Sequence, residues 1–145
     1  MDGHELAVYA LLGLALLGSG SAHARITRAM KATPPRPDRR RMTKSEIMAL
    51  AEMVGFPDSN LAAAIALAES NAPATHPPTG NPEAIGDGGL SFGLWQIYTR
   101  VHPEYSQAEL FDPLKNAKAA FKISEGGKNW RPWSTYRHGQ YKAFL

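Results

Sequence analysis

The sequence of 145 residues contains no cysteine. Disulfide bonds and thiolate metal sites are therefore excluded, and the length suffices for one domain with a hydrophobic core. The five histidines lack metal-ligand spacing, so we expect dispersed surface residues, no metal site and no cofactor. These histidines are His4, His23, His76, His102 and His138.

Acidic residues are almost absent from one stretch of the chain. Between Arg25 and Lys44, eight Lys or Arg residues accompany the single acid Asp38, whereas from Ser45 onward eight basic residues accompany ten acidic ones. The formal charge of +3 therefore belongs to a short basic segment. Residues 25–42 of this segment contain three prolines and no aromatic residue, which predicts a solvated, extended linker. Anionic lipid could bind this linker, and nucleic acid is the weakest partner hypothesis.

A long apolar run, Leu6 to Leu17, fades into a Gly/Ser cluster and predicts an apolar helix within residues 1–24. A membrane or docking helix over residues 6–22, a signal peptide and a buried structural helix all remain open. Ala22-His23-Ala24 fits a signal-peptide cleavage pattern, but the residues before the run are acidic where a signal peptide needs positive charge. The basic residues follow the run, which favours a cytoplasmic C-terminal body if the run spans a membrane.

Residues 43–145 are predicted to form one mainly helical domain. A capping box, Thr43-Lys44-Ser45-Glu46, starts a helix that ends at Gly55. A second helix is expected from Asp58 or Ser59 to about Ser70.

The remainder of the domain alternates irregular and helical segments. Residues 71–90 lack a helical period, which often marks a functional loop. Residues 90–98 are apolar and favour either a strand or a helix start. A third helix is expected between Asp112-Pro113 and Gly126-Gly127, and an aromatic-rich tail follows.

Glu69 stands out because it lies on the apolar face of the second helix, four residues after Ile65. Burial and the negative end of the helix dipole should both raise the pKa of its carboxyl. A glutamic acid that stays protonated near neutral pH can donate a proton to the leaving group in glycoside cleavage. The alternative is a glutamate that turns to solvent at the helix end.

Four sequence motifs follow one another in the domain: Glu69-Ser70, Ser91-Phe92-Gly93-Leu94-Trp95-Gln96-Ile97, Phe111-Asp112-Pro113-Leu114-Lys115-Asn116-Ala117 and Trp130-Arg131-Pro132-Trp133-Ser134-Thr135-Tyr136. In this order they resemble the lysozyme-like superfamily and its lytic transglycosylases. The final motif looks like versions from phage and bacterial wall-degrading domains. The resemblance covers residues 43–145 and implies a mainly α, α+β fold in which a small irregular or β region forms a glycan cleft.

By this resemblance, Glu69 is the general acid and base. Gln96 and the backbone around Ser91 and Gly93 would line the cleft, and Tyr136 would lie near Glu69 and the substrate. Glycine at position 93 would also let the backbone approach a sugar. Four aromatic residues could offer ring faces to sugars or belong to the core: Trp95, Tyr98, Trp130 and Trp133.

The choice between hydrolysis and transglycosylation depends on a second carboxylate. Animal-type lysozymes carry an aspartate where this chain has Ser91, so the resemblance favours a mechanism with one acid, in which the 6-hydroxyl of the sugar closes an anhydro ring. Asp87 is the best candidate for a second carboxylate and would favour a lysozyme-type hydrolase. Glu83 is a weaker candidate, and both could be solvated loop acids.

We therefore expect a peptidoglycan lytic transglycosylase that acts on the MurNAc–GlcNAc backbone. The apolar run and the basic linker favour a phage virion protein that enters the host envelope, with other virion proteins as partners. The alternatives are a structural or delivery protein that uses the fold for docking, and a secreted or membrane-anchored bacterial enzyme of the periplasm.

Overall fold

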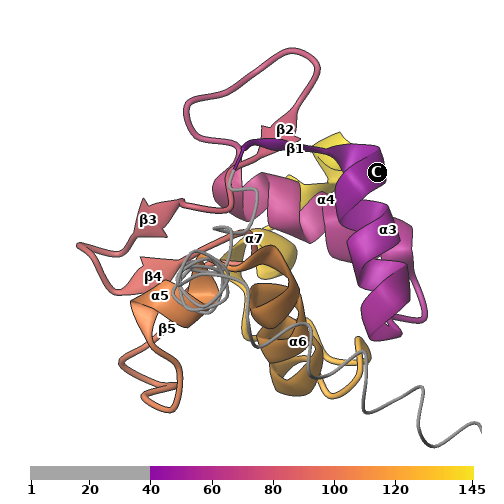
Figure 1. Ribbon diagram of the computed structural model, residues 1–145. Helices are drawn as coiled ribbons and strands as arrows, with labels where there is room; N and C mark the ends of the chain where they lie inside the picture. Colours follow the sequence, from indigo (N-terminus) through magenta and orange to yellow (C-terminus); the bar gives the residue numbers. More distant parts are fainter. Residues whose placement is uncertain (1–39) are drawn as a thin grey trace, which may run out of the picture. The chain divides into compact units, whose positions relative to one another are not determined.

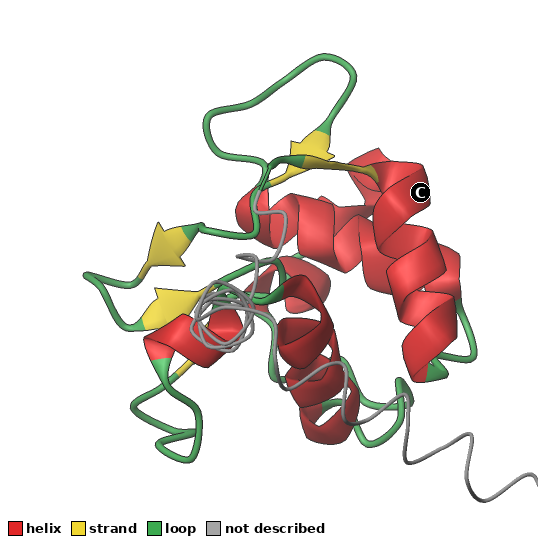
Figure 2. Cartoon of the chain, viewed as in Figure 1, coloured by secondary structure: helices red, strands yellow, loops and turns green. Residues whose placement is uncertain are grey.

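The computed structural model describes residues 40–145, which form a mainly helical body with two small antiparallel sheets (Figures 1 and 2). The predicted apolar helix of residues 1–24 and most of the predicted linker lie outside the described residues. Within residues 40–145, no helix is long and apolar enough to cross a membrane.

The first two helices of the body confirm the capping predictions. Helix α3, Lys44–Val54, begins with a complete capping box between Thr43 and Glu46, and Gly55 ends it in the left-handed conformation at φ 103°. Helix α4, Ser59–Ser70, has Asp58 as its N-cap, whose side chain accepts a hydrogen bond from the Leu61 amide.

Helix α4 is the buried centre of the domain. Every residue from Ala62 to Leu67 is buried, and the helix packs against α3 and the C-terminal 3₁₀ helix. Such a helix must be apolar almost all round, which explains its run of alanine, leucine and isoleucine. Glu69 in its last turn therefore lies at the edge of the core.

Short strands frame the loop that follows α4. Strand β1, Met42–Thr43, pairs with β2, Thr79–Gly80, and strands β3, Ile85–Gly86, β4, Ser91–Phe92, and β5, Ile97–Tyr98, form a three-stranded antiparallel sheet. Residues 71–90, expected to be irregular, thus contain two two-residue strands. Residues 90–98 form strands and a turn, and no helix.

Arg41, within the predicted linker, fastens the loop to the body. Its guanidinium donates hydrogen bonds to the Thr79 hydroxyl at 2.8 Å and the Thr79 carbonyl at 2.7 Å. It also donates to the Asn71 side chain at 3.2 Å. These bonds hold both ends of the loop 71–79.

The C-terminal half contains one predicted helix and three elements that were not predicted. Helix α6 confirms the prediction, with Asp112 as N-cap and proline in its first turn. The elements without a prediction are α5, α7 and the 3₁₀ helix η1, which are too short for apolar periodicity to reveal. The bounds are α5 Gln107–Leu110, α6 Pro113–Ile123, α7 Ser134–Arg137 and η1 Gln140–Phe144.

Buried aromatic rings join the tail to the helices. Phe56 stacks on Trp95 with centroids 6.0 Å apart and on Trp130 at 5.4 Å. Trp130 also contacts Trp133 at 4.9 Å, and the Trp133 indole donates a hydrogen bond to the Trp95 carbonyl at 2.7 Å. This packing places the segment before α7 beside the end of α4.

Asn116 of α6 connects the motif around Trp95 to the rest of the domain. Its fully buried side chain accepts a hydrogen bond from the Trp95 amide at 2.9 Å. It donates to the Phe92 carbonyl at 2.9 Å and the Leu110 carbonyl at 3.0 Å. Three buried backbone groups therefore depend on one amide side chain.

Replacing Asn116 by alanine should destabilise the domain by about 3–5 kcal/mol, because it leaves these backbone groups without partners. Denaturant unfolding of both proteins measures the difference. The matched control is Asn129→Ala, which removes the exposed bond to Glu125 and one bond to a backbone amide. Equal losses for the two variants would contradict the role given to Asn116.

Candidate active site

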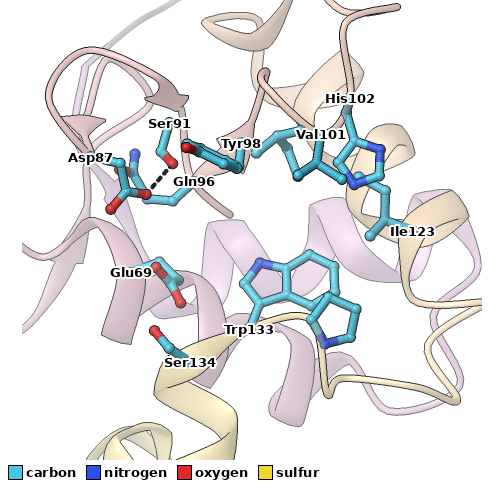
Figure 3. Close-up of a pocket in the computed structure, with 12 residues that line it drawn as sticks. Glu69, Asp87, Ser91, Gln96, Tyr98, Val101, His102, Ile123, Trp133 and Ser134 are labelled. Atoms are coloured by element: carbon cyan, nitrogen blue, oxygen red, sulfur yellow. Dashed lines mark hydrogen bonds between the residues drawn. The ribbon is translucent and has the colours of Figure 1, made fainter.

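A cavity of about 380 Å³ opens beside the last turn of α4 (Figure 3). The three-stranded sheet and the loop after it supply one side, and the segment leading into α7 supplies another. Its lining residues are Glu69, Asp87, Ser91, Gln96, Ile97, Tyr98, Val101, His102, Ile123, Pro132, Trp133 and Ser134.

Glu69 lies half-buried in this cavity, and one hydroxyl holds its carboxyl. Thr135 Oγ1 donates a hydrogen bond to Glu69 Oε1 at 2.6 Å. The removal of the carboxyl from water raises its pKa above the ordinary value, and the negative charge of Asp87 adds to this. The bond from Thr135 lowers the pKa but does not cancel the effect of burial.

The position of Glu69 on α4 also disfavours its charged form. The negative end of the helix dipole lies at the last turn, and that turn carries no basic residue. A carboxyl in this environment retains its proton to a higher pH than an exposed glutamate does.

Asp87 and Ser91 lie at the same end of the cavity as Glu69 (Figure 3). The hydroxyl of the buried Ser91 donates a hydrogen bond to Asp87 Oδ2, and Asp87 itself is exposed. Asp87 also adopts a positive φ of 49°, in the loop between β3 and β4. The structure thus brings the candidate second carboxylate into the cavity with Glu69.

Gln96 lines the cavity, but its side chain also holds the loop together. Its amide nitrogen donates to the Ala84 carbonyl at 3.0 Å and the Gly93 carbonyl at 2.9 Å. A β-carbon at Gly86 would lie 2.3 Å from Gln96 Oε1, so the amide packs directly on that glycine. Gln96 therefore fixes the position of the loop that carries Asp87.

Gly93 and Tyr136 are not among the residues that line the cavity with Glu69. Gly93 is buried, and a β-carbon on it would lie 2.3 Å from the Leu110 carbonyl and from the Asn116 amide nitrogen. Its missing side chain makes room for the close approach of Leu110 and Asn116. The Tyr136 ring stacks on Tyr141 with centroids 5.0 Å apart and lines a neighbouring cavity.

The aromatic candidates divide between the cavity and the core. Tyr98 lines the cavity, Trp95 and Trp130 are buried in the aromatic cluster, and Trp133 belongs to both. Glu83 is exposed and lies outside the lining.

Sequence reasoning missed several residues of the site, above all Thr135. Thr135 lies 66 positions from Glu69 in the chain, so no local pattern could reveal the contact. The end of the cavity away from Glu69, where Val101 lies, was also not predicted (Figure 3). Val101 is an exposed apolar residue, and such a residue can mark a binding surface. The other missed lining residues are Ile97, His102, Ile123, Pro132 and Ser134.

The cavity thus combines an acidic end, Glu69 and Asp87, with an end lined by apolar and aromatic groups. Such an arrangement can transfer protons to and from a bound, uncharged polar molecule. Among residues 40–145, no group of three or more His, Asp or Glu side chains could hold a metal ion.

The family model described as a lysozyme-like domain matches residues 48–135, more than half of the chain. The chain therefore belongs to the lysozyme-like domain family. The match contains Glu69, Asp87 and Thr135 and ends just before Tyr136. Membership in the family supports a peptidoglycan-acting, glycosidic-bond-cleaving enzyme in general. No curated protein and no solved structure matches the chain.

The raised pKa of Glu69 makes the stability of the fold depend on pH. Because the folded state binds this proton more tightly than the unfolded chain, its contribution to stability is fully present below the ordinary pKa of 4.5. The contribution is lost as the pH rises through the higher pKa of the folded state. The wild type should therefore lose stability relative to Glu69→Gln as the pH rises from about 4 to neutral.

Denaturant unfolding at a series of pH values measures this difference. Glu52→Gln, an exposed glutamate of α3, is the matched control for the removal of one negative charge. A difference between wild type and Glu69→Gln that stays constant with pH would refute the burial effect.

Proposed function

We propose that the protein is a peptidoglycan lytic transglycosylase that cleaves the MurNAc–GlcNAc backbone with Glu69 as its acid and base. One observation carries the proposal: a half-buried glutamic acid with a raised pKa faces the cavity of a lysozyme-like domain. A protonated carboxyl is the group that glycoside cleavage needs at the leaving oxygen.

The contact with Thr135 supports a role for each carboxyl oxygen of Glu69. Thr135 Oγ1 donates a hydrogen bond to Oε1 and orients the group, and we assign the proton that goes to the glycosidic oxygen to Oε2. The bond between the sugar C1 and this oxygen then breaks, and the carboxylate takes the proton of the 6-hydroxyl of the same muramyl residue. The bond from O6 to C1 closes an anhydro ring, and no water is consumed.

Glu69→Gln should reduce the initial rate of wall clearing by about 10²–10⁴-fold, because glutamine keeps the shape of the side chain but cannot donate a carboxyl proton. Turbidity of purified peptidoglycan measures the rate. The control is Glu83→Gln, which removes a carboxylate of the same loop region outside the cavity. Undiminished clearing by Glu69→Gln would sink the proposal.

A lysozyme-type hydrolase is the second candidate, because Asp87 shares the cavity with Glu69 and its charge raises the pKa of Glu69. In a hydrolase, Asp87 would act as nucleophile or activate a water molecule. Its exposure and its bond to Ser91 better suit a solvated loop acid. These two observations favour the transglycosylase.

Asp87→Asn separates the two chemistries. If the enzyme is a transglycosylase, Asp87→Asn should keep its rate within a few-fold and release anhydro-muramyl ends, since the reaction needs only Glu69. If the enzyme is a hydrolase, Asp87→Asn should lose activity about as strongly as Glu69→Gln, and the wild type should release reducing ends. Mass spectrometry of the products tells the two ends apart by one water molecule.

We also propose a setting: a phage virion protein that opens the wall locally during entry. The apolar run of residues 6–22 and the basic segment after it support this setting. In a protein that a cell inserts into its own membrane, basic residues after the run would leave the C-terminal body in the cytoplasm, away from the wall. A protein that reaches the envelope from outside does not follow this rule. Finding the chain in purified particles would support the setting. Finding it in the periplasm of uninfected cells instead would favour a bacterial enzyme.

A further inference from the structure

The last 20 residues of the chain hold four Lys or Arg and no acid, although the chain from Ser45 onward is net acidic. Three of these cations, Arg131, Arg137 and Lys142, line a second cavity of about 570 Å³. The ion pairs formed among residues 40–145 involve other side chains. No Asp or Glu lines this cavity, and like charges that gather without an acidic side chain leave a positive potential that an anion can neutralise.

Two exposed side chains of this cationic cavity, Arg137 and Lys142, contact the backbone beside them. Arg137 Nη1 donates a hydrogen bond to the Arg131 carbonyl at 3.1 Å. Lys142 folds over Gly139, with its Nζ 3.9 Å from the point that a β-carbon would occupy. The stacked rings of Tyr136 and Tyr141 form a wall beside the cations. Arg137 and Lys142 therefore stay accessible to a ligand beside these rings.

Helix α7 connects the cationic cavity to the candidate active site. Ser134 lines the cavity with Glu69, Thr135 bonds to Glu69, and the next two residues, Tyr136 and Arg137, line the cationic cavity. The two cavities are therefore lined by neighbouring residues of a single helical turn, which rises about 5.4 Å.

We propose that the cationic cavity binds carboxylates of the peptide that a muramyl sugar carries while its glycan strand occupies the active site. The inference rests on the proposed function. Two or three extended residues span about 7–10 Å, which exceeds the rise of the single turn of α7. The fork of Arg137 and the ammonium group of Lys142 are suited to carboxylates. The substrate class of the enzyme is then peptide-bearing glycan, in preference to bare glycan.

Equilibrium binding tests this in the full chain carrying Glu69→Gln, which should leave the bound strand intact. The ligands are glycan strands with their peptides and the same strands stripped by an amidase. Adding Arg137→Gln and Lys142→Gln should weaken binding to peptide-bearing strands about 10-fold, as expected for two partly exposed charge contacts. Binding to stripped strands should change less than two-fold. The matched control is Lys115→Gln with Lys118→Gln, two exposed cations of α6 that line neither cavity.

A second measurement needs no variant of the cationic cavity. Chemical amidation of the peptide carboxyls should weaken binding by the same factor. Unchanged binding after amidation would overturn the inference, as would an equal loss on stripped strands. If the Arg137→Gln and Lys142→Gln changes weaken binding only to walls that carry phosphodiester polymers, the cavity binds phosphate groups and the inference is also overturned. Binding and cleavage are measured separately. If the protein prefers peptide-bearing strands but never cleaves them, the proposed transglycosylase activity is refuted and the proposed binding site is not.

Discussion

The carboxyl group of Glu69 imposes the main physical constraint on the domain, because Glu69 lies in the last turn of a helix that must be buried. Helix α4 supplies the core, and its last turn brings an acid to the core's edge. Burial of that acid is unfavourable when it is charged, so the protonated form is favoured and the pKa of Glu69 is raised. The hydroxyl of Thr135 satisfies one oxygen and fixes the orientation of the group, which requires α7 to dock beside α4. The aromatic cluster of Trp95, Trp130 and Trp133 holds the tail in that position.

Several motif residues stabilise the backbone around the site, and this role accounts for their presence without contact to substrate. Asn116 ties the turn of the three-stranded sheet to α6, and Gly93 leaves room for that contact. Gln96 closes the loop that carries Asp87. A change at any of these three positions would move Asp87 or Ser91 relative to Glu69, so a loss of activity there would not by itself show substrate binding.

The sequence predicts the parts of the fold that local chemistry determines. Capping residues and apolar periodicity give α3, α4 and α6, and the apolar face of α4 points to Glu69. Tertiary contacts determine the rest. Thr135, rather than Tyr136, bonds to Glu69 because α7 is a single turn whose direction depends on the packing of Trp133. The meeting of Asp87 with Glu69 depends on how β3 and β4 pair, which no periodicity in residues 71–90 reveals.

The central claim is that the fold keeps Glu69 protonated above the usual pH range of a glutamic acid. NMR titration of the side-chain carboxyl carbon of Glu69 tests it most directly. The account predicts a midpoint above the ordinary pKa, which rises further in Thr135→Val because the lowering hydrogen bond is lost. A midpoint at or below the ordinary value in the folded wild type would contradict the account.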